Sequence, residues 1–113
     1  MGTPATTFIY DEEGTPLLAF WRQSDGHPEV HLKELKKFCA GYDIVTGLHD
    51  ETTKTANGMG DFAAQCLTHF KLQYPIGGIY VLSPKTCREW LTDFEYEIRY
   101  SSETGKLRVL HVK

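Results

Sequence analysis

The stretch TTFIYDEEGTPLLAFWRQ (residues 6–23) holds two runs of β-branched, aromatic and other apolar residues. Residues 6–12 and 17–23 have the composition of strands, and the segment EGTP (13–16) supplies a connection of hairpin length. The second run is apolar at both alternating sets of positions, with Phe20 on one set and Trp21 on the other. A strand of this kind is covered on much of both faces. The sequence therefore predicts a β-hairpin whose second strand lies inside the sheet.

Two helices are predicted downstream of the hairpin from the spacing of apolar residues. The first runs from Pro28, which suits the first helical position, to Ala40, and its apolar stripe comprises Leu32, Leu35, Phe38 and Cys39. The second begins at Asn57, a favourable N-cap residue, and ends near Tyr74, before Pro75. Its apolar face comprises Phe62, Ala63, Cys66, Leu67 and Phe70. The polar segment 47–56 is predicted to be a long loop.

Three further strands are predicted in the second half of the chain, at residues 76–82, 94–100 and 107–112. The resulting order ββααβββ indicates the α+β class, as a single domain over residues 1–113. We expect a two-layer sandwich in which a mainly antiparallel five-stranded sheet carries both helices on one face. Burial is expected at Leu18, Phe20, Leu35, Phe38, Phe62, Cys66, Phe70, Ile79 and Val81.

The composition of the 113 residues is that of an ordinary globular domain, with 41% hydrophobic and 24% charged residues, so a disordered chain, a fibre and a solenoid array are all poor fits. Fifteen acidic residues against 12 lysines and arginines give a net charge of −3, whereas a duplex-binding protein usually carries a basic excess. No apolar run approaches the length of a membrane span. Three cysteines without a Cys-x-x-Cys motif indicate a reducing compartment. We therefore expect a cytoplasmic protein with no membrane and no duplex nucleic acid as partner.

A cluster of polar side chains lies between the second strand and the first helix. Arg22, Asp25, His27 and His31 bring two imidazoles, a carboxylate and a guanidinium into one corner. Two histidines four residues apart on a helix can share a metal ion, but His27 precedes a proline and is biased away from helical geometry. We predict instead a hydrogen-bonded network of Arg22, Asp25, His31 and Asn57 with Asp25 as its hub, because a carboxylate accepts several bonds.

The segment Gly58-Met59-Gly60-Asp61-Phe62-Ala63 matches the glycine pattern of dinucleotide-binding folds. Those folds need a strand just before the glycines and an acidic residue after the next strand, and this chain supplies neither. What remains is a glycine-rich helix start with free N–H groups, which favour anions. Asp61 already supplies negative charge there, so an anion or nucleotide at Asn57, Gly58 and Gly60 is an alternative only.

Catalytic groups are scarce in the sequence. Cys66 lies on an apolar helix face, where a thiolate is disfavoured, and Cys87 lies between Lys85 and Arg88 without a positioned base. The acidic segment 49–51 (HDE) is typical of a solvated loop. Neither a nucleophile–base pair nor a complete ligand set is recognisable. No catalytic residue, metal site or cofactor is predicted.

The run RQxDGxPxxH (residues 22–31) and the run NGMGxxAAQ (residues 57–65) together resemble a family of small uncharacterised proteins of bacteria and their phages. Members of that family often carry a glycine where Leu32 stands. The resemblance covers most of the chain and implies an intracellular setting. It transfers no activity and no catalytic residue.

Both motifs end at the start of a predicted helix. A ten-residue loop extends up to ~35 Å, enough to return the chain along the first helix, so we expect the two helices to run parallel. Their starts would then lie side by side. This arrangement would gather the candidate binding residues at one corner: Arg22, Asp25, His27, His31, Asn57 and Gln65.

The leading functional hypothesis is a non-catalytic binding protein, of the kind with which a phage or mobile element engages a host protein, because such a function needs only a surface. One alternative is a small hydrolase or nucleotide-processing enzyme that uses the corner of Asp25, His27 and His31. Another is a sensor of a small anion or nucleotide at the helix start of residues 57–60.

Overall fold

The predicted hairpin is confirmed in a computed structural model that describes residues 2–47, 54–85 and 90–113. Strand β1 (Ala5–Tyr10) pairs antiparallel with β2 (Pro16–Arg22), and the register shifts at Ile9/Tyr10. The turn between them is held by Asp11, whose Oδ1 accepts the N–H groups of Glu13 and Thr15 at 2.9 and 2.8 Å. This is an Asx turn, in which the side chain replaces a backbone acceptor.

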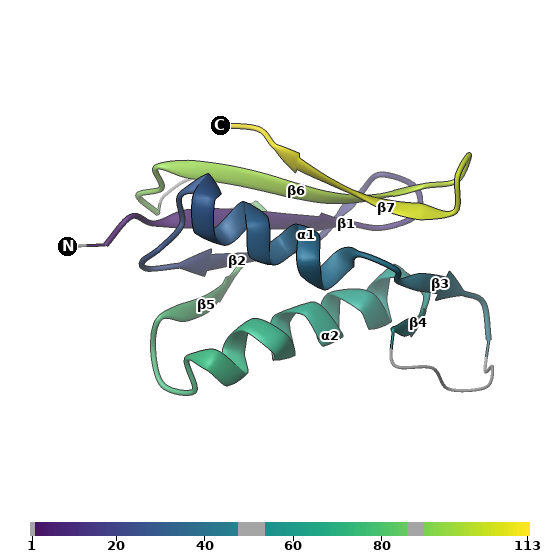
Figure 1. Cartoon of the computed structure of the whole chain (residues 1–113), viewed down its shortest axis with the longest axis horizontal. Coiled ribbons are helices and arrows are strands. Elements are labelled where there is room, and N and C mark those ends of the chain that lie inside the picture. Colours follow the sequence, from purple (N-terminus) through teal and green to yellow (C-terminus); the bar gives the residue numbers. More distant parts are fainter. Residues whose placement is uncertain (1, 48–53, 86–89) are drawn as a thin grey trace.

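Five strands form one mixed sheet in the order β5-β2-β1-β6-β7 (Figure 1). The three later strands are β5 (Ile79–Leu82), β6 (Phe94–Ser101) and β7 (Lys106–His111). All neighbouring pairs are antiparallel except β1 and β6. The predicted α+β architecture is confirmed, and β2 lies inside the sheet between β1 and β5 as expected.

The helical layer covers one face of this sheet (Figure 1). It consists of a π-helical turn η1 (Pro28–Leu32), which continues directly into α1 (Lys33–Cys39), and of α2 (Gly58–Gln73). Among the described residues no helix is long and apolar enough to cross a membrane.

The expectation of parallel helices is wrong. Met59, in the first turn of α2, donates its backbone N–H to Glu12 in the β1–β2 turn, whereas Tyr74 at the other end of α2 contacts Arg22 at the end of β2. His31 in η1 also contacts Arg22. The helices therefore run antiparallel and their starts lie at opposite ends of the sheet (Figure 1). Consecutive helices commonly pack antiparallel. The connection between α1 and α2 does not return the chain to the start of α1, so α2 begins near the end of α1.

A second, two-stranded sheet lies in the connection between the helices, where only a loop was predicted. It pairs β3 (Asp43–Val45) with β4 (Thr55–Asn57) in parallel. Asn57 ends β4 and is the N-cap residue of α2, as predicted. Its side chain makes no cap hydrogen bond, because its Oδ1 accepts the N–H of Gly47 at 2.9 Å instead. The segment 49–51 lies outside the described residues.

The core lies between the sheet and the helices. Of the residues expected there, Phe20, Leu35, Phe62, Cys66, Phe70 and Ile79 are buried, while Leu18 and Phe38 are partly buried. The prediction that Val81 is buried is wrong, since 57% of this residue is exposed. Val81 lies on the edge strand β5, whereas the main contacts of the helices with the large sheet are those of α2 with β2 and of α1 with β7.

The side chain of Lys54, which lies in a later segment of the chain, caps the C-terminal end of helix α1. Its Nζ donates to the carbonyl oxygens of Lys37, Phe38 and Ala40 at 3.1, 3.2 and 2.6 Å. A cation bound to the last carbonyls of a helix stabilises it through both hydrogen bonds and the helix dipole.

Replacing this lysine tests the helix cap. We expect Lys54→Met to lower the free energy of unfolding by about 1–2 kcal/mol, because three carbonyls lose a charged donor. Urea denaturation measures the change. The matched control is Lys36→Met, an exposed lysine of the same helix end. Equal effects of the two substitutions would refute a specific cap.

Candidate functional site

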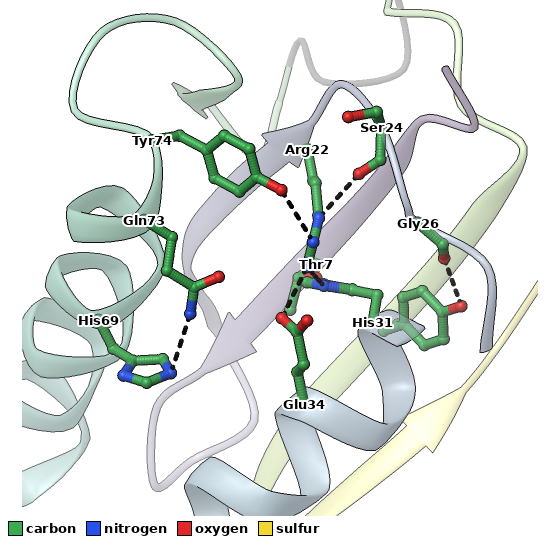
Figure 2. A network of polar contacts seen from close by, with 10 residues as sticks. Thr7, Arg22, Ser24, Gly26, His31, Glu34, His69, Gln73 and Tyr74 are labelled. Atoms are coloured by element: carbon green, nitrogen blue, oxygen red, sulfur yellow. Dashed lines mark hydrogen bonds and ion pairs between the residues drawn. The ribbon is translucent and has the colours of Figure 1, made fainter. Parts of the chain in front are cut away.

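Half of the predicted polar corner forms one buried network at the end of β2. Arg22 Nη1 lies 2.8 Å from Glu34 Oε2 on α1 and 3.1 Å from His31 Nδ1 on η1. Its Nε donates to the carbonyl of Ser24 at 2.8 Å and its Nη2 to Tyr74 Oη at 3.2 Å. Figure 2 shows these groups converging on the guanidinium from β2, η1, α1 and the end of α2.

His31 links the guanidinium to the centre of the sheet. Its Nε2 lies 2.7 Å from Thr7 Oγ1 on β1. Because arginine can only donate, Nδ1 is the acceptor and Nε2 carries the proton, which it donates to Thr7. The ring is fully buried, and the rings of Phe70 and Tyr96 lie 5.3 and 5.2 Å from it.

The electrostatics of this network stabilise a charged arginine and a neutral histidine. Burial, and secondarily the charge of Arg22, lowers the pKa of His31 to about 3. Burial also disfavours the charged form of Arg22, but the hydrogen bond and charge of Glu34, aided by Tyr74, outweigh it and raise its pKa. A histidine with this pKa and no exposed surface does not exchange protons with a substrate near neutral pH.

Asp25 is not the hub of the network. It is exposed and has a backbone φ of 60°, and Glu34 supplies the carboxylate that Arg22 needs. The chain turns sharply here because Gly26 packs against the hairpin, where an added Cβ would lie 2.5 Å from the Cβ of Ala5. Tyr96 Oη donates to the carbonyl of Gly26 at 2.7 Å and fixes the turn.

His27 lies outside the network as well. It is extended (φ −70°, ψ 157°), as its place before Pro28 predicted, and its Nδ1 lies 3.3 Å from the carboxylate of Glu29. The proposed grouping of Asp25, His27 and His31 is therefore not assembled, since only His31 points inward.

The other predicted residues surround the start of α2, at the opposite end of the molecule. Gly58 has a φ of +80°, and Gly60 is exposed in the first helical turn. Asp61 Oδ2 accepts the N–H of Asn57 at 2.8 Å. Glu12 Oε2 accepts the N–H of Met59 at 3.1 Å. Two carboxylates thus occupy the N–H groups of Asn57 and Met59, and their negative charge is unfavourable for a bound anion.

Gln65 belongs to this second group and has a structural role there. Its Oε1 accepts the hydroxyl of Tyr42 at 2.6 Å, and its Nε2 donates to the carbonyl of Thr55 at 3.1 Å. It thereby ties α2 to the small β3–β4 sheet. It lies at the opposite end of the sheet from Arg22 and His31.

The environments of Cys39 and Cys66 disfavour the reactive thiolate form. Burial raises the pKa of Cys39 to about 12 and holds that of Cys66 well above its ordinary value. Both are buried thiols on helix faces, as predicted. Cys87 lies outside the described residues. Within residues 2–47, 54–85 and 90–113, no three side chains of His, Cys, Asp or Glu are grouped so that they could hold a metal ion.

A group of three aromatic side chains and one leucine, which the sequence did not single out, lies on the sheet face opposite α1 and α2. Its members are Trp21 on β2, Tyr80 on β5, and Trp90 and Leu91 before β6; we call it the aromatic surface. The ring centroids of Trp21 and Trp90 lie 4.9 Å apart, and that of Tyr80 lies 5.9 Å from each. Trp21 Nε1 donates to the carbonyl of Leu91 at 2.9 Å.

This aromatic surface remains accessible to solvent. Tyr80 is 40% exposed, Trp90 41% and Leu91 78%. The sequence contains one indication of this surface. The residues of β2 that alternate with Phe20, among them Trp21, are also apolar, which predicted that this face of the strand is covered as well. Trp21 faces away from the helices because it alternates with the buried Phe20 and Arg22.

Comparison of the chain with protein-family models, with curated proteins and with solved structures found no match. The resemblance of residues 22–31 and 57–65 to a bacterial and phage family stays a prediction.

Proposed function

We propose that this protein is a non-catalytic binding protein that engages an apolar segment of another protein through the aromatic surface. The observation that supports this is the exposure of Tyr80, Trp90 and Leu91 together on the sheet face opposite α1 and α2 (Figure 1). Contiguous exposed apolar groups mark interaction sites, and tryptophan and tyrosine are enriched among residues that contribute most binding energy.

The chemistry of the aromatic surface favours a polypeptide over other ligands. The net charge of −3 opposes a nucleic acid, whose binding depends on neutralised phosphates. The rings of Trp21 and Trp90 meet at 62°, so they do not form one flat platform for a base or a sugar. Leu91 adds an aliphatic side chain, which suits the side chains of an apolar protein segment.

A random peptide library displayed on phage serves as the probe. Peptides enriched on the wild-type protein are expected to lose at least about tenfold in affinity for Trp90→Ser and for Tyr80→Ser, since each removes an exposed aromatic anchor. The matched control is Leu72→Ser, because Leu72 is exposed on α2, on the other side of the sheet. Thermal melts establish that each variant is folded.

Two results would overturn the proposal. One is a selection that enriches no peptide on the wild-type protein over the Trp90→Ser variant. The other is a set of enriched peptides whose affinity falls with Leu72→Ser and not with the aromatic variants.

A further inference from the structure

Strand β5 forms the edge of the sheet beside the aromatic surface, and its hydrogen bonds to β2 determine which of its backbone groups point outward. The N–H of Gln23 donates to the carbonyl of Gly78 at 2.9 Å, which makes these two residues a hydrogen-bonded pair. In an antiparallel ladder such pairs alternate, so Trp21 and Tyr80 form the next one. The backbone groups of Ile79 and Val81 consequently point away from β2, toward the outer edge.

Lys71 on α2 lies at this same edge. Its Nζ donates to the carbonyl of Ile79 at 3.0 Å and to that of Gly77 at 3.3 Å. It also lies 5.9 Å from the ring centroid of Tyr80. The carbonyl of Ile79 is one of the outward groups, so this lysine occupies an acceptor that an added strand would use. Although Lys71 lies on a helix, its ammonium opposes unwanted strand pairing at this edge in the way that a lysine on an edge strand does.

The apolar side chains of β5 suit an added strand on both of its sides. Tyr80 joins the aromatic surface, and Val81, 57% exposed, projects from the opposite side of the strand. Successive residues of an extended peptide alternate in the same way. One set of its side chains would meet Tyr80 and Trp90, while the other would meet Val81.

We propose, building on the function proposed above, that the partner segment adds to β5 as a strand and carries an acidic side chain that takes up Lys71. The N–H groups of the segment would then pair with the carbonyl oxygens of Ile79 and Val81. The ammonium of Lys71 must leave the carbonyl of Ile79 for that pairing. A carboxylate on the partner compensates it with a charge-assisted hydrogen bond.

A second copy of this chain is a poorer occupant of the edge. Pairing of β5 with itself would bring two Lys71 ammonium groups to one short edge, and like charges brought together at an interface are unfavourable. A foreign segment with an acidic residue has no such conflict. The lysine therefore selects the partner and also discourages self-association.

The experiment repeats the peptide selection on charge-reversed protein. Peptides enriched on the wild-type protein are expected to share one Asp or Glu position, and those enriched on Lys71→Glu to carry Lys or Arg there. Lys85→Glu is the control, because Lys85 is an exposed lysine beyond the end of β5. It should keep the acidic preference.

A second pair of variants tests the backbone contact. Val81→Pro removes an outward N–H and no bond to β2, so the variant is expected to fold and to lose at least about tenfold in peptide affinity. Val81→Ala retains the N–H and should lose less. Peptides N-methylated at alternate amides apply the same test from the partner's side if the proline variant melts early.

The outcomes separate this inference from the proposed function. Enriched peptides that depend on Trp90 but show no charge reversal with Lys71→Glu, or that tolerate both Val81→Pro and N-methylation, overturn strand addition and leave the aromatic surface as the binding site. Peptides that do not depend on Trp90 overturn both. Charge reversal together with loss on Val81→Pro supports the inference.

Discussion

Arg22→Met is expected to lower the free energy of unfolding by about 3 kcal/mol, measured by urea denaturation. The substitution keeps the aliphatic stem but removes the donor for Glu34, His31 and the carbonyl of Ser24. Breaking a buried ion pair from one side leaves an uncompensated charge, which costs more than the pair itself contributes. The carboxylate of Glu34 is one-third exposed and is partly solvated, so we place the cost at the low end of the usual range.

The matched control is Arg99→Met. Arg99 lies on the other face of the sheet, and its Nε is also 2.8 Å from a carboxylate, that of Glu97, but the guanidinium is more exposed. Exposed pairs contribute little, so this variant should lose less than about 1 kcal/mol. The double variant Arg22→Met/Glu34→Leu should recover part of the loss. Equal losses at Arg22 and Arg99 would refute the network as a major source of stability.

Acid is expected to destabilise the protein through His31. Its pKa is about 3 in the folded protein, against about 6.5 in an unfolded chain. Between these two pKa values the unfolded chain binds more protons than the folded protein. The contribution of His31 to the free energy of unfolding is therefore fully present above pH ~6.5 and is lost as the pH is lowered toward ~3. From pH ~7 to ~4.5 the loss attributable to His31 is roughly 2–3 kcal/mol.

The pH dependence is isolated by comparison with a variant that cannot take up the proton. His31→Gln has lower stability at neutral pH, but the part of the acid loss due to the imidazole should vanish. His69→Gln, at an exposed histidine of α2, should keep the wild-type slope. Urea midpoints across the pH range provide the measurement. An unchanged slope in His31→Gln would mean that the carboxylates alone cause the acid loss.

The elements of the fold follow from local patterns. The hairpin, the two helices and the later strands were recoverable because apolar periodicity and the punctuation of Pro16, Pro28 and Pro75 act over short distances. The β3–β4 pair was missed because strands of three residues carry too little pattern. The direction of α2 was missed because it depends on packing between helices, which no local signal in the connection encodes.

The polar corner was predicted in part for a related reason. Arg22 and His31 were chosen correctly because each interrupts an apolar pattern and must be satisfied when buried. Asp25 was the nearest carboxylate in sequence, but its left-handed backbone conformation turns it outward, and Glu34 lies one helical turn beyond His31. Sequence proximity is a poor guide to the partner of a buried charge when a helix brings another carboxylate closer.

The aromatic surface depends on tertiary structure even more strongly. Trp21 and Tyr80 could be placed on strands, but their pairing required the position of β5 beside β2. Trp90 and Leu91 lie in a connection whose path the sequence did not specify. An exposed cluster of this kind arises only when three separate segments meet.

Intrinsic fluorescence offers the most direct test of binding at the aromatic surface. Trp21 and Trp90 are the two tryptophans of the chain, and both belong to that surface. Titration with an enriched peptide is expected to shift their emission to shorter wavelength, with saturation at the concentration at which calorimetry records binding. Binding recorded by calorimetry without any change in tryptophan emission would place the peptide elsewhere and contradict the account.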